Sequence, residues 1–76
     1  MIANLITISP EIQSGTPVFS KTRVPVRILF DYLKNGDTID EFLHDYPSVS
    51  KIQLLKILSF LENQITFTHY EENITG

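Results

Sequence analysis

The sequence predicts a mainly α-helical domain, a three-helix bundle of the helix-turn-helix (homeodomain-like) type with a short N-terminal β-hairpin. Three observations predict this fold. Apolar residues recur with a helical period between residues 25 and 65. Within that span, two segments have the Ser/Thr-x-x-Glu/Gln pattern that caps the start of a helix. A short β-branched segment followed by a turn signal precedes all of the helices.

Residues 5–19 are predicted to form the hairpin. Residues 5–8 (Leu-Ile-Thr-Ile) are rich in β-branched side chains, which favour a brief strand, and Val18 and Phe19 can pair back against them. The turn is expected within residues 13–17 because it contains a residue free to take a positive φ and a proline that restrains its predecessor, Gly15 and Pro17. Two short strands are marginal alone, so the hairpin must pack on the helices.

The first helix is predicted over residues 25–35. Pro25 suits a first helical turn, and Gly36 suits a left-handed C-terminal cap. The apolar side chains of this helix cover an arc too broad for one surface stripe: Val26, Ile28, Leu29, Phe30, Tyr32 and Leu33. The helix is therefore expected at the centre of the domain, in contact with both of its neighbours.

Two further helices are predicted over residues 38–46 and 50–65. A capping box at residues 38–41 (Thr-Ile-Asp-Glu) begins the second helix, and Pro47 ends it. Another capping box at residues 50–53 (Ser-Lys-Ile-Gln) begins the third helix. The three predicted helices thus follow the hairpin in the order 25–35, 38–46 and 50–65.

Residues 1–65 are assigned to a single domain, because a chain of 76 residues is too short to close two separate cores. Residues 66–76 are expected to form a tail that is flexible or partner-dependent. The chain has no cysteine, so disulfides cannot stabilise it. Association into a homo-oligomer or with another partner is the expected source of extra stability.

The formal net charge of −3 argues against strong non-specific binding to nucleic acid, because such binding depends on neutralising phosphates. The charge is uneven, however. Residues 21–34 are mostly basic and residues 37–45 are acidic, so one side of the molecule is expected to be basic and another acidic.

No segment approaches the roughly 20 apolar residues of a membrane span, and no signal peptide is readable at the start. A cytoplasmic protein without a membrane partner is expected.

The second and third predicted helices, joined around Pro47, have the outline of a helix-turn-helix. In such units the first turns of the second helix enter the major groove of DNA. Five polar residues near that position have side chains that suit contacts with bases or phosphates: Ser48, Ser50, Lys51, Gln53 and Lys56. The alternative is that they form the solvated face of a plain helical bundle.

The sequence gives no positive sign of catalysis, and we do not expect an enzyme. His44 and His69 lie in different segments without a third nitrogen or sulfur ligand, so a zinc site is not expected. The acidic residues between positions 37 and 45 are accounted for partly by helix capping and the helix dipole. No glycine-rich phosphate loop is present, and no cofactor is expected.

Residues 8–26 (ISPEIQSGTPVFSKTRVPV) are similar to the signature of the domain-of-unknown-function 433 (DUF433) family. That signature has a polar-Pro step, then Gly-x-Pro, then Gly-Thr-Arg-[Ile/Val]-Pro-Val. The resemblance covers about residues 5–65 and includes these motif positions: Gly15, Pro17, Thr22, Arg23, Pro25, Gly36 and Pro47.

Lys21 departs from the family pattern, which has glycine at that position. If that glycine takes a positive φ, Lys21 either strains the turn by about 1 kcal/mol or reshapes it. Arg23 is expected to be partly buried and to anchor the loop.

The resemblance implies a helix-turn-helix domain, and many relatives look like antitoxins encoded beside a PIN-like ribonuclease toxin. It therefore implies that this chain neutralises such a nuclease, with repression of its own operon through operator DNA as a second activity. Three aromatic residues are the candidates for the partner contact or for a homodimer seam: Phe60, Phe67 and Tyr70. Two alternatives are a stand-alone DNA-binding transcriptional regulator and a structural homo-oligomerisation module that does not bind DNA.

Overall fold

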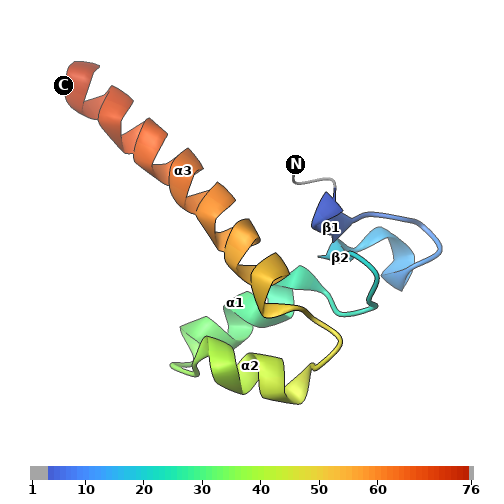
Figure 1. Ribbon diagram of the computed structural model, residues 1–76. Helices are drawn as coiled ribbons and strands as arrows, with labels where there is room; N and C mark the ends of the chain where they lie inside the picture. The colour runs from blue at the N-terminus through green and yellow to red at the C-terminus, as the bar shows by residue number, and fades with distance from the viewer. Residues whose placement is uncertain (1–3, 76) are drawn as a thin grey trace.

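The computed structural model describes residues 4–75, and it describes side chains through residue 66. A two-stranded hairpin is followed by three helices, α1, α2 and α3, so the predicted fold class is confirmed. The hairpin, α1, α2 and the start of α3 form the body of the molecule, and the rest of α3 projects from it as a straight rod (Figure 1).

The hairpin consists of β1 (Ile6–Thr7) and β2 (Val18–Phe19). The strands are antiparallel, in a register that pairs Ile6 with Phe19. Both side chains of β2 are fully buried. The hairpin is therefore part of the core, as expected for strands too short to be stable alone.

A 3₁₀ turn, Gln13–Gly15, connects the strands within the turn predicted at residues 13–17. Gly15 has φ +88°, which is the left-handed conformation that glycine adopts without steric cost. Thr16, which precedes Pro17, is extended at φ −66° and ψ 134°. Both of these backbone predictions are confirmed.

The first helix, α1 (Val26–Lys34), begins directly after Pro25, close to the prediction of residues 25–35. Two residues after the helix ends, Gly36 has φ +90°. The amide of Asp37 donates a hydrogen bond of 2.9 Å to the carbonyl of Tyr32. This bond closes a Schellman-type end, and it confirms Gly36 as the C-terminal cap.

The second helix, α2 (Ile39–Asp45), begins with the predicted capping box. The Thr38 hydroxyl accepts from the Glu41 amide at 3.1 Å, and the Glu41 carboxylate accepts from the Thr38 amide at 2.8 Å. Both otherwise unpaired amides at the helix start are thus satisfied. The chain then turns through residues 46–50 into the third helix.

The third helix, α3 (Lys51–Thr75), has 25 residues. It begins where predicted but continues past residue 65, the end that the sequence indicated. Neither proline nor glycine occurs between residues 51 and 75, so no residue in this stretch interrupts the helical hydrogen bonds. The expectation that the tail depends on a partner for its order stays a prediction.

The core joins all of these elements through a small set of buried apolar side chains: Val18, Phe19, Val26, Leu29, Phe42, Val49, Leu54 and Ile57. Phe42 of α2 is at the centre of its aromatic part. Its ring centroid lies 5.7 Å from that of Phe19, 5.4 Å from that of Tyr32 and 5.1 Å from that of Tyr46. One aromatic side chain therefore contacts the hairpin, α1 and the end of its own helix.

Candidate functional site

The start of α3 and the turn before it carry the residues predicted to contact DNA. Ser48, Ser50, Lys51 and Lys56 are all exposed there. The Nζ atom of Lys51 lies 3.5 Å from an Oδ atom of Asp40 on α2, but an exposed ion pair of this kind is weak. These four side chains remain accessible to a ligand.

Gln53, the fifth predicted DNA contact, is half-buried and has a structural role. Its side-chain amide donates to the carbonyls of Leu5, at 2.9 Å, and Ser20, at 3.2 Å. Only half of the predicted second capping box forms, because the Ser50 hydroxyl accepts from the Gln53 amide at 3.3 Å while the Gln53 side chain turns to the hairpin. Reading adenine needs that side-chain amide, which is already engaged inside the protein.

The prediction that Arg23 is partly buried and anchors its loop is wrong, since Arg23 is exposed. Thr22 anchors the loop instead. Its hydroxyl donates to the Phe19 carbonyl at 2.7 Å and accepts from the Val24 amide at 3.0 Å. Arg23 contributes only its carbonyl, which accepts from the Gln13 side chain at 3.3 Å. The guanidinium is therefore not used to hold the loop.

Lys21 takes the first of the two outcomes considered from the sequence, a strained turn. Its φ is +68°, in the left-handed region where an L-residue with a Cβ atom costs about 1 kcal/mol relative to glycine. The side chain is exposed. The lysine thus keeps the backbone conformation that suits the glycine of the family pattern.

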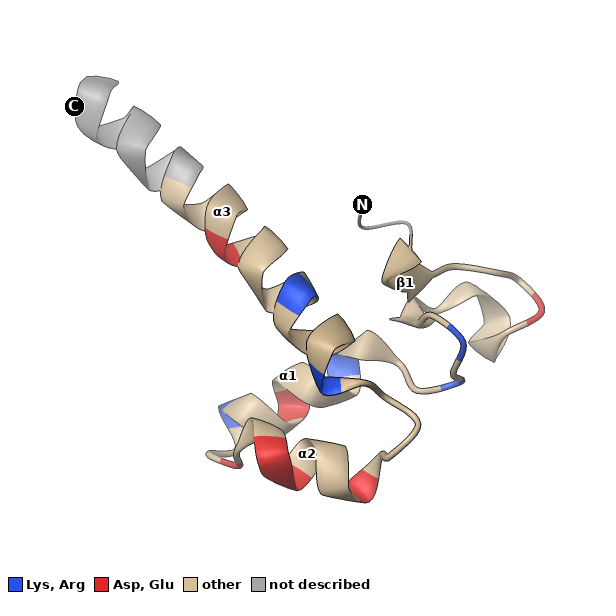
Figure 2. Ribbon diagram, viewed as in Figure 1, with Lys and Arg blue, Asp and Glu red and all other residues tan. Residues whose placement is uncertain are grey.

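Lys21 and Arg23 line an open groove of ≈ 550 Å³, which we call the basic groove. Its walls come from the hairpin, the loop that follows it and the turn before α3: Thr7, Ile12, Lys21, Thr22, Arg23, Val24 and Ser48. The lining contains no acidic residue. Figure 2 shows two basic positions on the loop between β2 and α1, on the side of the molecule away from α2.

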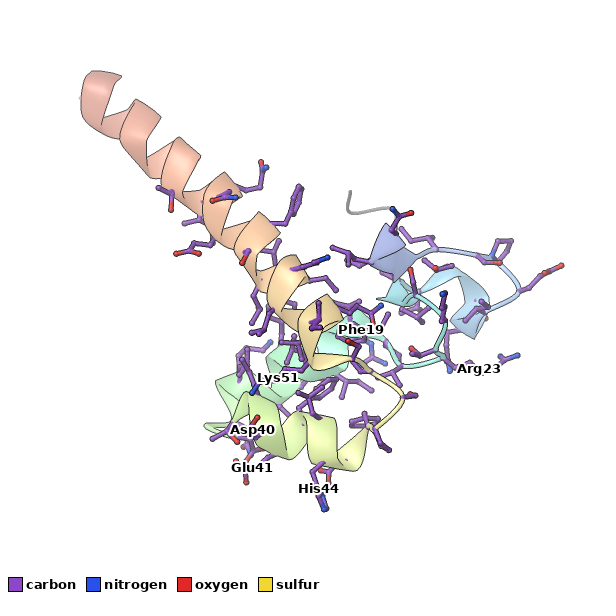
Figure 3. The ribbon with its side chains drawn as sticks, in the orientation of Figure 1. Phe19, Arg23, Asp40, Glu41, His44 and Lys51 are labelled. Atoms are coloured by element: carbon purple, nitrogen blue, oxygen red, sulfur yellow. The ribbon has the colours of Figure 1, made fainter. Side chains whose placement is uncertain are left out.

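The opposite side of the body is acidic. In Figure 3 the side chains of Asp40, Glu41 and His44 lie around α2, far from Arg23. His44 is exposed, and its Nδ1 lies 3.4 Å from an Oδ atom of Asp45. Within residues 4–66, where side chains are described, no three His, Asp or Glu side chains gather as ligands for a metal ion.

Asp45 also accepts a hydrogen bond of 2.5 Å from the Tyr32 hydroxyl. This bond, with a smaller contribution from His44, lowers the pKa of the Asp45 carboxyl. The same bond raises the pKa of Tyr32 from 10.0 to about 12. The pair links α1 to the end of α2 on the exposed surface.

A second, apolar groove of ≈ 340 Å³ lies where α3 leaves the body, and we call it the apolar groove. It is lined by Phe30 of α1 and by residues of α3: Leu58, Leu61, Glu62, Ile65 and Thr66. Up to residue 66 of α3, where side chains are described, four large apolar side chains are at least 40% exposed: Ile52 (68%), Leu55 (44%), Phe60 (40%) and Ile65 (69%). Of the predicted partner residues, Phe60 is among these, whereas the side chains of Phe67 and Tyr70 lie outside the described residues.

A family model described as "Protein of unknown function (DUF433)" matches residues 6–61. This range includes the hairpin, α1, α2 and the buried part of α3. The chain belongs to the DUF433 family. No curated protein and no solved structure matches the chain. None of the helices in residues 4–75 is both long and apolar enough to span a membrane.

Proposed function

We propose that this DUF433 protein is a non-catalytic binding protein of the antitoxin type, which neutralises a PIN-like ribonuclease by covering part of its surface. The observation that carries the proposal is the apolar groove beside α3, with Ile65 69% exposed at its edge. The kind of partner is suggested by the family resemblance. The apolar groove is the surface that would contact this partner.

The exposure of α3 supports a protein partner on energetic grounds. Burying a side chain the size of leucine or isoleucine contributes about 1.5–3 kcal/mol, and a helix with apolar residues on several sides is usually covered. Ile52 and Ile65 lie on different sides of α3 at 100° per residue, and both are largely exposed. Grouped apolar side chains with a polar rim are typical of interaction surfaces.

The test is co-expression of the tagged chain with the product of a neighbouring PIN-like nuclease gene. Ile65→Ser is expected to weaken the complex at least tenfold, whereas Asn63→Ser, an exposed position on another side of α3, is expected to leave it unchanged. Failure of the wild-type chain to bind or inhibit the nuclease would remove the proposal. If sedimentation instead detects a homodimer that Ile65→Ser dissociates, and no nuclease binds, the chain is a structural oligomerisation module.

A second candidate function is sequence-specific binding of operator DNA. The exposure of Ser48, Ser50, Lys51 and Lys56 at the start of α3 supports it. In a gel shift with the DNA upstream of its own gene, Lys51→Ala/Lys56→Ala is expected to abolish binding. Arg27→Ala/Lys34→Ala removes the same charge from α1 and serves as the matched control. Equal binding by both double variants would exclude this position of the recognition helix.

A further inference from the structure

We infer that the basic groove is a phosphate-binding flank, in which Lys21 and Arg23 hold the backbone of a nucleic acid beside the start of α3. The inference rests on the proposed operator binding and deepens it. The sequence placed all DNA contacts on one helix and its preceding turn. The geometry points to a second group of contacts from the loop between β2 and α1.

The position of this flank relative to α3 is fixed by hydrogen bonds. The Gln53 amide on α3 holds the carbonyl of Ser20, the residue immediately before Lys21. On the other side of Lys21, the Thr22 hydroxyl is bonded to the Phe19 carbonyl inside the hairpin. Both neighbours of Lys21 are therefore anchored, which lowers the entropy cost of presenting its charge to a ligand.

The charges of the flank are free for a ligand. Arg27 and Lys34 each lie 3.9 Å from the carboxylate of Asp31, and Lys51 contacts Asp40. In the part of the chain whose side chains are described, neither Lys21 nor Arg23 has such an acidic neighbour. Ser48 also lines the groove. Lysine, arginine and serine are among the side chains that contact phosphate oxygens.

The backbone of Lys21 is a separate observation that supports the same conclusion. Its φ of +68° is a conformation that glycine would adopt without strain, and glycine is the residue of the family pattern. Residues in strained backbone conformations cluster at functional sites. Lys21 is a cation in such a conformation, and it lines the basic groove.

The arrangement favours a nucleic acid that approaches from the hairpin side. The groove shares Ser48 with the helix-turn-helix turn, so a phosphate bound there lies next to the helix predicted to enter the major groove. On the α2 side, Asp40 and Glu41 are exposed and repel phosphates. A duplex is therefore expected to contact the basic groove and the start of α3 together.

The experiment measures binding of the full chain to a fluorescent duplex from its own upstream DNA, over a series of salt concentrations. Lys21→Gly/Arg23→Gln is expected to weaken binding about tenfold and to lower the slope of log K against log[salt] by about 2, equally on an unrelated duplex. Circular dichroism verifies that the variant is folded. Arg27→Ala/Lys34→Ala, with the same change in charge, is expected to leave the slope unchanged.

The outcomes separate this inference from the function on which it rests. No binding by the wild-type chain overturns both. Wild-type binding that Lys51→Ala/Lys56→Ala abolishes, but that Lys21→Gly/Arg23→Gln leaves intact in slope and affinity, overturns the flank alone. Inorganic phosphate is tested last, as an alternative ligand of the groove. If it gives saturable amide shifts at residues 21–23 while no duplex binds, the groove holds a free anion and the nucleic-acid assignment is wrong.

Discussion

The start of α3 lies between two flanks that differ in charge and in how they are attached. On one side, the hairpin and its loop carry Lys21 and Arg23, and the Gln53 amide ties the hairpin to α3 through backbone carbonyls. On the other side, α2 carries acidic residues and is attached through the buried ring of Phe42. The comparison shows that a neutral side chain, Gln53 or Phe42, anchors each flank. The charged side chains of Lys21 and Arg23 are therefore not needed to attach the hairpin flank.

The α2 flank is attached through a single fully buried side chain, and Phe42→Ala should have the largest effect. Removing a fully buried phenyl ring typically lowers the free energy of unfolding by about 3–5 kcal/mol, a large part of the total for a small domain. We expect loss of the cooperative urea transition. Phe60→Ala removes an equivalent ring that is 40% exposed and should have a much smaller effect. Similar losses in both variants would contradict the central position of Phe42.

The hairpin flank should respond locally to Gln53→Ala. Two carbonyls lose their donor, so we expect a loss of about 1–3 kcal/mol and faster amide hydrogen exchange in residues 5–20. Exchange in α2 should not change. Gln53→Glu keeps the shape but places an acceptor against two carbonyl oxygens, so it should be at least as destabilising. If neither variant changes the exchange of the hairpin, Gln53 does not attach it.

Lys21→Gly should stabilise the protein, because glycine relieves the positive φ. The expected gain is up to about 1 kcal/mol, partly offset by the greater freedom of glycine in the unfolded chain. Lys21→Ala removes the same charge but keeps the strain, so its melting temperature should not rise. A lower melting temperature for Lys21→Gly would show that the turn is not strained. The same variant is expected to bind DNA more weakly. Lysine at position 21 would then lower the stability of the fold while it raises the affinity for DNA.

The smallest expected effect concerns the contact between α1 and α2. The lowered pKa of Asp45 means that its stabilisation is complete above its ordinary pKa of 3.8 and is lost as the pH falls further. The raised pKa of Tyr32 means that its stabilisation is complete below pH 10 and is lost as the pH rises toward 12. The free energy of unfolding, measured with urea over a range of pH values, should decrease at both extremes. Tyr32→Phe should flatten them, and an unchanged profile would contradict the role of this bond.

Local features of the sequence predicted the fold well. The Thr38 capping box, the positive φ of Gly15 and the Gly36 cap each depend on residues within a few positions of one another. Gln53 shows where such reasoning fails. Its local pattern predicted a capping role, but its side chain binds carbonyls 33 and 48 residues away in the chain. No local rule includes partners at that separation.

The candidate site was predicted only in part for a related reason. Exposure of the α3 residues follows from helical periodicity, which is regular. Arg23 lies in a loop without such a period, and its apolar neighbours indicated burial, whereas the short hydroxyl of Thr22 reaches the hairpin carbonyl instead. The basic groove brings together residues 7, 12, 21–24 and 48. It arises only when the hairpin folds back beside the turn before α3.

The uninterrupted course of α3 has a consequence for simultaneous occupancy. At 1.5 Å per residue, Lys51 and Ile65 are separated by about 21 Å along the axis. A duplex at the first of these positions and a globular protein at the second need not collide. One copy of the chain is thus long enough to act as a spacer between two different macromolecules, with both attached at once.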